Sequence, residues 1–135
     1  MSVTSLYPVL ISADPGETSA FFRRWFGLEL VFASDWYVSL RTATSELAVV
    51  AADHPTVPAG FGVPASGVIV NVEVTDVDVL HGRMVVDGGL PELLPLRSEA
   101  FGQRHFITSA PGDVLVDIIT PIPPTAEFAV GYAGA

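Results

Sequence analysis

Near its C-terminus the chain reads Phe101-Gly-Gln-Arg-His-Phe-Ile-Thr-Ser-Ala-Pro-Gly-Asp-Val-Leu-Val-Asp-Ile-Ile-Thr-Pro121. Pro111 and Gly112 are turn formers, and both flanks are rich in β-branched and aromatic residues, which predicts two strands around an Ala-Pro-Gly-Asp turn. His105 falls on one strand and Asp117 on the other. Because side chains alternate between the faces of a strand, these two can converge on one surface. There they would form either a metal or acid/base pair, or two polar groups in a binding site.

The same kind of pattern opens the chain. Residues 6–12 are a short β-like run, and the following Asp14-Pro15-Gly-Glu17 predicts the start of a helix, with Asp14 as N-cap and Pro15 in the first helical position. Gly27 suits the left-handed position that ends such a helix. Strands are then expected over residues 28–33, 36–41 and 46–52.

A second copy of this pattern follows a Pro/Gly/Ala-rich segment. Residues 67–74 predict a strand that ends, like the first one, just before a helix-capping residue, here Thr75 or Asp76. Gly88-Gly89 stop this second helix, and strands are expected over residues 93–96, 104–109 and 113–120. The chain is therefore read as a repeated unit of strand, helix and three strands.

The repeat predicts an α+β fold in one domain, residues 1–135. It consists of two tandem βαβββ modules, residues 5–53 and 67–121, joined by a linker over 54–66 and followed by a tail over 122–135. Each module has too few strands to bury its own sheet. The modules are therefore expected to pair into a curved mixed sheet with helices outside and a concave inner face, which we call the cup, where a ligand would sit.

Composition limits the partners. The net charge is −9, with six basic residues that are all arginine, which argues against nucleic acid and anionic membranes and excludes lysine chemistry. The absence of cysteine removes disulfides and thiolate metal sites. A 50% hydrophobic content excludes disorder, and no run is long enough to span a bilayer. Residues 1–5 lack the features of a signal peptide, so a cytoplasmic protein is expected.

A family resemblance rests on these features. The motif Asp-x-x-x-x-x-Ala-Phe-Phe-Arg-Arg-Trp-Phe-Gly-Leu at residues 14–28, the βαβββ repeat and the closing Val-Leu-Val-Asp-Ile-Ile resemble the vicinal oxygen chelate superfamily. This superfamily includes glyoxalase I, extradiol dioxygenases and fosfomycin- and bleomycin-resistance proteins. The resemblance covers residues 5–121. It implies the fold, and it leaves open a metal enzyme or a metal-free drug-sequestering protein.

The resemblance implies metal ligands on the first and last strand of each module. The corresponding positions hold Tyr7, Val49, Ile69 and Asp117, and a shift of three residues would offer Glu46 in place of Val49. A divalent site needs three or four convergent ligands. We therefore expect no metal and no other cofactor.

The same comparison implies which residues line the cup. The expected ligand-binding set is Tyr7, Trp36, Tyr37, Ser39, Val49, Phe61, Asn71, Glu73, His105, Ile107 and Asp117. Two interpretations of His105 stay open, a ligand contact or a hydrogen-bonded inward histidine, and Asp117 would pair with His105 or Arg104. Asn71 and Glu73 favour a ligand or solvated cavity, because unpaired burial of an amide and a carboxylate costs several kcal/mol.

Two functions of different classes follow. The first is a homodimer of the bleomycin-resistance type that sequesters a largely apolar, aromatic antibiotic or related natural product and catalyses nothing. In it Trp36, Tyr37 and Phe61 stack on the ligand while polar side chains orient it. The second is a glyoxalase-like lyase or isomerase that uses His105 with Asp117 or Glu73 as acid/base, with or without a metal.

Overall fold

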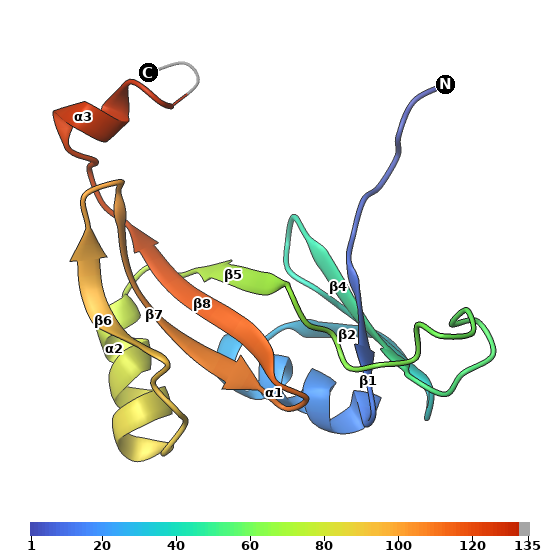
Figure 1. The fold of residues 1–135 in the computed structure, drawn as a ribbon. Coiled ribbons are helices and arrows are strands. Elements are labelled where there is room, and N and C mark those ends of the chain that lie inside the picture. Colours follow the sequence, from blue (N-terminus) through green and yellow to red (C-terminus); the bar gives the residue numbers. More distant parts are fainter. Residues whose placement is uncertain (133–135) are drawn as a thin grey trace. The chain divides into compact units, whose positions relative to one another are not determined.

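The computed structural model of the chain describes residues 1–132 (Figure 1). The chain divides into two compact units, each described here by itself. The first unit comprises Met1–Val68 and Ala110–Val114, and the second comprises Ile69–Ser109 and the residues from Leu115 on. The turn between the last two strands thus belongs with the first unit, where Thr18 donates a hydrogen bond to the carbonyl of Pro111.

The first unit is a mixed four-stranded sheet with one face covered by a helix. Its strands lie in the order β1-β4-β3-β2, with β1 parallel to β4 and the other neighbours antiparallel. The elements are β1 (Val9–Ser12), α1 (Pro15–Phe26), β2 (Glu29–Ala33), β3 (Tyr37–Arg41) and β4 (Glu46–Ala51).

The second unit repeats this topology. Its sheet has the order β5-β8-β7-β6, and β5 is parallel to β8 as β1 is to β4. The elements are β5 (Ile69–Glu73), α2 (Val77–His81), η1 (Gly82–Asp87), β6 (Leu94–Glu99), β7 (Gln103–Ala110), β8 (Val114–Pro121) and α3 (Ala126–Ala129). The α+β class and the duplicated βαβββ arrangement are therefore confirmed. The cup needs both units together and stays a prediction.

Helix α1 begins and ends where local sequence predicts. Asp14 has an extended backbone and its Oδ1 accepts the N–H of Glu17 at 3.1 Å. Pro15 occupies the first helical turn, and Gly27 adopts the left-handed conformation, with φ of 65°, while its N–H bonds to the carbonyl of Arg23. Asp76 caps the second helix in the same way by accepting the N–H of Val79.

The cap of α1 yields a testable prediction. Asp14→Ala removes the acceptor for an otherwise unpaired helical N–H, so the free energy of unfolding should fall by about 1 kcal/mol in urea titration. Asp14→Asn keeps an acceptor oxygen and should retain most of that stability. Equal losses in the two variants would show that charge, and not the hydrogen bond, stabilises this helix start.

Each sheet buries one face against its helix. In the first unit Leu10, Val38 and Leu40 join Phe22 of α1, and all four are buried. In the second unit Phe106, Val116 and Ile118 lie with Val77 and Met84, again buried. Thr120 fixes the start of α2 because its hydroxyl accepts the N–H of Val77 at 2.9 Å and donates to the carbonyl of Val74 at 3.0 Å.

Two elements differ from the sequence prediction. The second helix was expected to run to Gly88, but after His81 it widens into the π-helical segment η1, where Gly88 donates to the carbonyl of Arg83, five residues earlier. Strand β6 was expected to end at residue 96 and instead continues to Glu99. Its register shifts between Leu94 and Arg97, and this bulge on an edge strand accommodates Pro95.

The segments after β4 and after β8 are both attached by backbone hydrogen bonds. In the expected linker, Ala65 donates to the carbonyl of Ile11 on β1. In the expected tail, Ile122 donates to the carbonyl of Gly102 and Thr125 to that of Ala100. Residues 133–135 of that tail lie outside the described residues. Within residues 1–132, no helix combines the length and apolarity needed to cross a membrane.

Candidate ligand-binding site

The polar centre of the second unit is His105 with a carboxylate on each side. His105 Nδ1 lies 2.8 Å from Asp117 Oδ1, and Nε2 lies 2.8 Å from Glu99 Oε2. Arg97 extends the chain of contacts by donating from Nε to Glu99 Oε2 at 2.9 Å. His105 and Asp117 are buried, at 4% and 7% exposure. The prediction that the final hairpin brings these two side chains together is therefore confirmed.

The two carboxyl groups titrate differently. Burial raises the pKa of Asp117, although the hydrogen bond and charge of His105 oppose that shift. The hydrogen bonds from His105 and Arg97 hold the pKa of Glu99 below its usual value. Glu99 therefore stays ionised at neutral pH, while Asp117 takes up a proton more readily than an ordinary aspartate.

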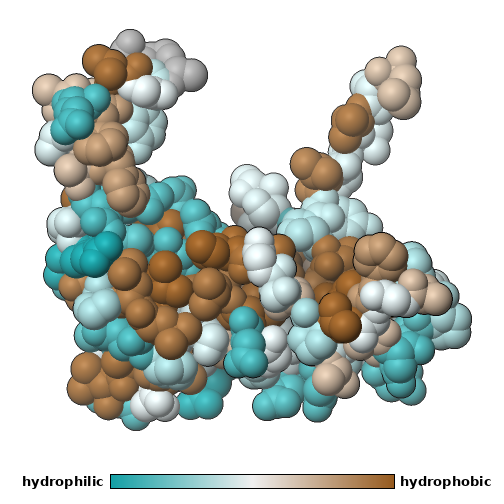
Figure 2. All heavy atoms as spheres, in the orientation of Figure 1, coloured by the Kyte–Doolittle hydropathy of each residue, from teal (hydrophilic) through white to brown (hydrophobic). Residues whose placement is uncertain are grey.

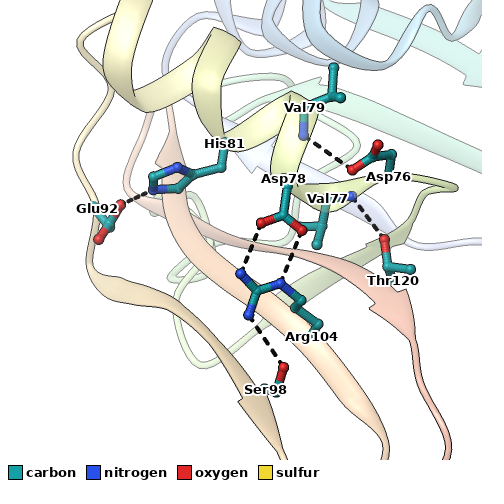
Figure 3. Close-up of polar contacts among 9 residues, drawn as sticks. All are labelled: Asp76, Val77, Asp78, Val79, His81, Glu92, Ser98, Arg104 and Thr120. Carbon is teal, nitrogen blue, oxygen red and sulfur yellow. Dashed lines mark hydrogen bonds and ion pairs between the residues drawn. The ribbon is translucent and has the colours of Figure 1, made fainter.

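The opposite face of this sheet holds a separate polar cluster (Figure 3). Arg104, next to His105 in sequence, donates to both carboxylate oxygens of Asp78 on α2, at 2.8 and 3.0 Å. His81 of the same helix contacts Glu92. Of the two partners considered for Asp117, the structure thus selects His105, and Arg104 pairs with α2.

The first unit carries a row of aromatic rings on and beside the helix-free face of its sheet. Phe32, Tyr37, Trp36 and His54 follow one another, and we call these four the aromatic row. Ring centroids are 6.2 Å apart for Phe32 and Tyr37 and 5.5 Å apart for Trp36 and Tyr37. The His54 ring stacks on Trp36 at 3.7 Å with an interplanar angle of 9°. Its Nδ1 accepts the N–H of Thr56, which holds the ring in place.

Tyr7 belongs beside this row. Burial raises the pKa of Tyr37, and neighbouring Tyr7 adds to the shift. Tyr7 is 41% exposed and Phe32 51%, while Trp36 and Tyr37 are half-buried. Ser39 shares their face, because it pairs with Phe32 on β2 and Ala48 on β4. Figure 2 shows that hydrophobic residues form a large part of the visible surface.

Other expected site residues group within the second unit. Asn71 pairs in register with Asp117, and Ile107 pairs with Leu94 on the face that holds His105. Glu73 ends β5 and lines a pocket described below. Asn71 and Glu73 are exposed, so the burial penalty invoked for them from sequence does not apply.

Val49 is the residue whose expected place the structure corrects. It pairs with Leu10 on β1 and Val38 on β3, and residues paired across neighbouring strands share a face. That face is the one covered by α1, and Val49 is 0% exposed. Val49 is therefore a core residue and lines no binding surface. Phe61 lies in the segment after β4 and is 66% exposed.

The donor set implied by the family does not fit a divalent metal. Ile69 offers no donor atom, and Val49 faces the helix. His105, the imidazole on the final hairpin, has both ring nitrogens in hydrogen-bond contact with carboxylates. Among residues 1–132, no group of three or more His, Asp or Glu side chains is arranged to hold a metal ion.

Three residues of these clusters were missed from sequence. Glu99 and Arg97 lie beyond residue 96, where β6 was expected to end; a strand carried to residue 99 would have placed both beside His105 by alternation. His54 is the first residue of the expected linker over residues 54–66 and was given no role there. Its position over Trp36 depends on a fold-back of residues 52–56 that leaves no periodic signal.

No protein-family model matches the chain, and no curated protein does either. Solved structures do resemble it. A lactoylglutathione lyase from Agrobacterium tumefaciens is 17% identical, with a TM-score of 0.69, and the match covers 88% of this chain and 95% of that one.

Two further structures agree in fold. A glyoxalase/bleomycin resistance protein/dioxygenase from Nocardioides is 17% identical over 90% of this chain and 85% of that one, with a TM-score of 0.69. TioX from Micromonospora sp. ML1 is 20% identical over 89% of this chain and 100% of that one, with a TM-score of 0.66. At these identities the likeness concerns the backbone arrangement. Together with the duplicated βαβββ topology, it shows that the chain has the fold of the glyoxalase, bleomycin-resistance and dioxygenase proteins of the vicinal oxygen chelate superfamily.

Proposed function

We propose that the protein binds and sequesters a largely apolar, aromatic natural product, such as an antibiotic, without changing it chemically. The observation that carries this proposal is the aromatic row with Tyr7 beside it. Exposed apolar surface on a soluble domain marks a binding surface more often than chance, and half-buried indole and phenol rings stack well on planar ligands. Trp36 already stacks on one planar ring within the protein, that of His54, at van der Waals distance.

The contacts of His105 support binding over catalysis. A general base or a metal ligand needs a ring nitrogen that reaches the substrate or the ion. Both nitrogens of His105 contact carboxylates within the protein, and its side chain is 6% exposed. In this proposal His105, Glu99 and Asp117 hold one another in place within the second unit and take no part in catalysis.

The protein in this proposal is a cytoplasmic homodimer that confers self-resistance on the cell that makes the ligand. Exposed apolar side chains on the edge strand β2, Leu30, Val31 and Phe32, support self-association. Light scattering coupled to size exclusion measures the mass directly, and a single species of monomer mass at all concentrations would refute the dimer.

The function is tested by titrating the protein with a panel of intercalating and DNA-damaging aromatic antibiotics. Trp25→Phe leaves Trp36 as the sole indole, so its fluorescence reports contact with the row. Mass spectrometry of the released ligand then shows whether the protein stored the compound unchanged or altered it chemically. The expected result is saturable quenching by at least one compound, which returns with its mass unchanged.

Trp36→Ala should weaken that binding about tenfold, because a stacked, partly desolvated indole is a typical hot-spot residue. Isothermal titration calorimetry measures the affinity without relying on the indole. Trp25→Ala is the matched control, since Trp25 lies on α1 with the Arg24 guanidinium over its ring, at 4.4 Å. Affinity lost equally in both variants would contradict a role for the aromatic row.

A second candidate is a lyase or isomerase. The 2.8 Å contact between His105 and buried Asp117 is the observation in its favour, since a carboxylate that orients an imidazole is a common acid/base arrangement. A second carboxylate, that of Glu99, lies 2.8 Å from the other ring nitrogen of His105, whereas Glu73 forms no hydrogen bond with His105 and lines the pocket described below. A bound compound that returns with an altered mass would establish this function and overturn sequestration.

A further inference from the structure

A pocket with a volume of about 390 Å³ lies where the tail meets the second sheet. Glu73 at the end of β5 and Gln103 at the start of β7 form its polar wall. Its apolar wall consists of Pro121, Ile122, Pro124, Ala129 and Tyr132. All of these residues belong to the second unit. The volume is in the range of small-molecule sites in proteins.

The apolar wall is held in place, because several contacts attach residues 122–132 to the turn between β6 and β7. Ile122 donates to the carbonyl of Gly102 at 3.0 Å, and the hydroxyl of Tyr132 donates to the carbonyl of Phe101. The rings of Phe101 and Phe128 meet edge to face at 6.3 Å. These contacts fix the ring of Tyr132 over the pocket.

Gly102 is required for this close approach. Its φ of 111° disfavours any other residue, and a Cβ there would lie 3.1 Å from both the Tyr132 hydroxyl and the Ile122 carbonyl. A side chain at this position would strain the backbone and make these two atoms shift by a few tenths of an ångström. The backbone is thus shaped to bring the tail onto the sheet.

The chemistry of the lining selects the charge of the ligand. Glu73 is the only carboxylate among the described residues that line the pocket, and these residues include no Arg, Lys or His. With a net charge of −9 the surrounding field also favours cations. A single carboxylate is too few donors for a divalent metal ion. An aromatic ring and two prolines beside a carboxylate suit an organic ammonium, whose charge meets the carboxylate while its carbon atoms contact the rings.

We propose that this tail pocket binds a small organic cation, a protonated amine with a short apolar body. Glu73 pairs with the ammonium group, Gln103 offers an amide oxygen as a second acceptor, and Tyr132 covers the alkyl part. The chain contains no lysine, so no ammonium side chain of its own competes for the site. The proposal does not depend on the sequestering function, because the aromatic row lies in the first unit.

The probes are butylammonium and its neutral analogue 1-butanol, titrated into ¹⁵N-labelled full-length protein at neutral pH. Butylammonium should give saturable shifts of the amide signals of Gly102, Gln103 and Ile122, and 1-butanol should bind about tenfold more weakly. Glu73→Gln should weaken butylammonium binding to the level of the alcohol. Tyr132→Leu should weaken it about threefold while leaving the preference for the cation.

Glu127→Gln is the matched control, because it removes one negative charge from α3 of the same tail without touching the lining. It should leave the affinity unchanged. An equal effect of Glu127→Gln and Glu73→Gln, equal binding of the amine and the alcohol, or shifts that do not saturate would each overturn the pocket as a cation site. Trp36→Ala should leave butylammonium binding unchanged, since Trp36 does not line this pocket, and this keeps the outcome distinct from the test of the aromatic row.

Discussion

The His105→Ala variant should be less stable than the wild type by about 3 kcal/mol at neutral pH, because it leaves buried Asp117 without its hydrogen-bond partner. Loss of one partner of a buried pair costs more than the pair itself contributes, since the remaining charge has neither water nor a donor. Urea titration followed by far-UV circular dichroism measures the difference. His105→Gln keeps a donor on the side chain and should lose less than half as much.

The deficit of His105→Ala should depend on pH, with a sign that follows from Asp117. Burial places the folded-state pKa of Asp117 above its unfolded value. Its ionisation therefore favours the unfolded state: the folded state is relatively more stable below the unfolded pKa, and that advantage is lost as pH rises through the folded pKa. Without His105 the free-energy cost of ionising Asp117 in the folded state grows. The difference in unfolding free energy between the variant and the wild type should therefore increase from acidic to neutral pH.

Glu99 acts in the opposite direction in the wild type. Its pKa is lowered by His105 and Arg97, so it contributes stability above its unfolded pKa and loses it as pH falls through the folded pKa. His105→Ala removes the hydrogen bond from His105, which is the larger of the two causes that lower the pKa of Glu99. A deficit that does not change between acidic and neutral pH would contradict the assignment of the destabilisation to an unpaired Asp117.

Phe106→Ala should cost about 4 kcal/mol of unfolding free energy, the largest effect expected from a single substitution in this hairpin. Phe106 is 0% exposed and lies on the face opposite to His105, where its ring meets His81 edge to face at 5.1 Å. Truncation leaves a cavity between the sheet and α2 that a close-packed core cannot fill. Thermal and urea denaturation both measure the loss.

Ile107→Ala is the control for Phe106, because the neighbouring side chain is half-buried on the helix-free face with Leu94. It should cost about 1 kcal/mol. The loss in Phe106→Ala should show no pH dependence comparable to that of His105→Ala, since no carboxylate is left unpaired. Similar losses at positions 106 and 107 would contradict the assignment of faces along β7.

Much of the fold could be predicted because its signals are local. Asp14, Pro15 and Gly27 act on the backbone within a few residues of themselves, and α1 begins and ends where they indicate. The duplicated pattern then determined the topology, since a βαβββ unit with a parallel first and last strand has few ways to form one sheet. The convergence of His105 and Asp117 also followed from local information, a short turn and strict alternation.

The candidate site was predicted less well because its contacts join residues far apart in sequence. Val49 was placed by superposing two hairpins, but the face it occupies depends on the pairing register of β4, and a shift of one residue moves a side chain to the other face. Glu99 lies beyond the expected end of its strand, because β6 continues past the register shift between Leu94 and Arg97. The sequence near β6 does not indicate that β7 can still pair with it after this register shift.

Residue types and their alternation were enough to determine the repeat, both ends of α1, the start of α2 and the meeting of His105 with Asp117. Only tertiary structure decided that Glu99 holds the second nitrogen of His105, that His54 stacks on Trp36, and that residues 122–132 enclose a pocket with Glu73. The physical reason is that hydrogen bonds and ring contacts of this kind depend on positions in space. Those positions are set by packing of the whole unit, and the neighbouring residues in the chain carry no separate signal for them.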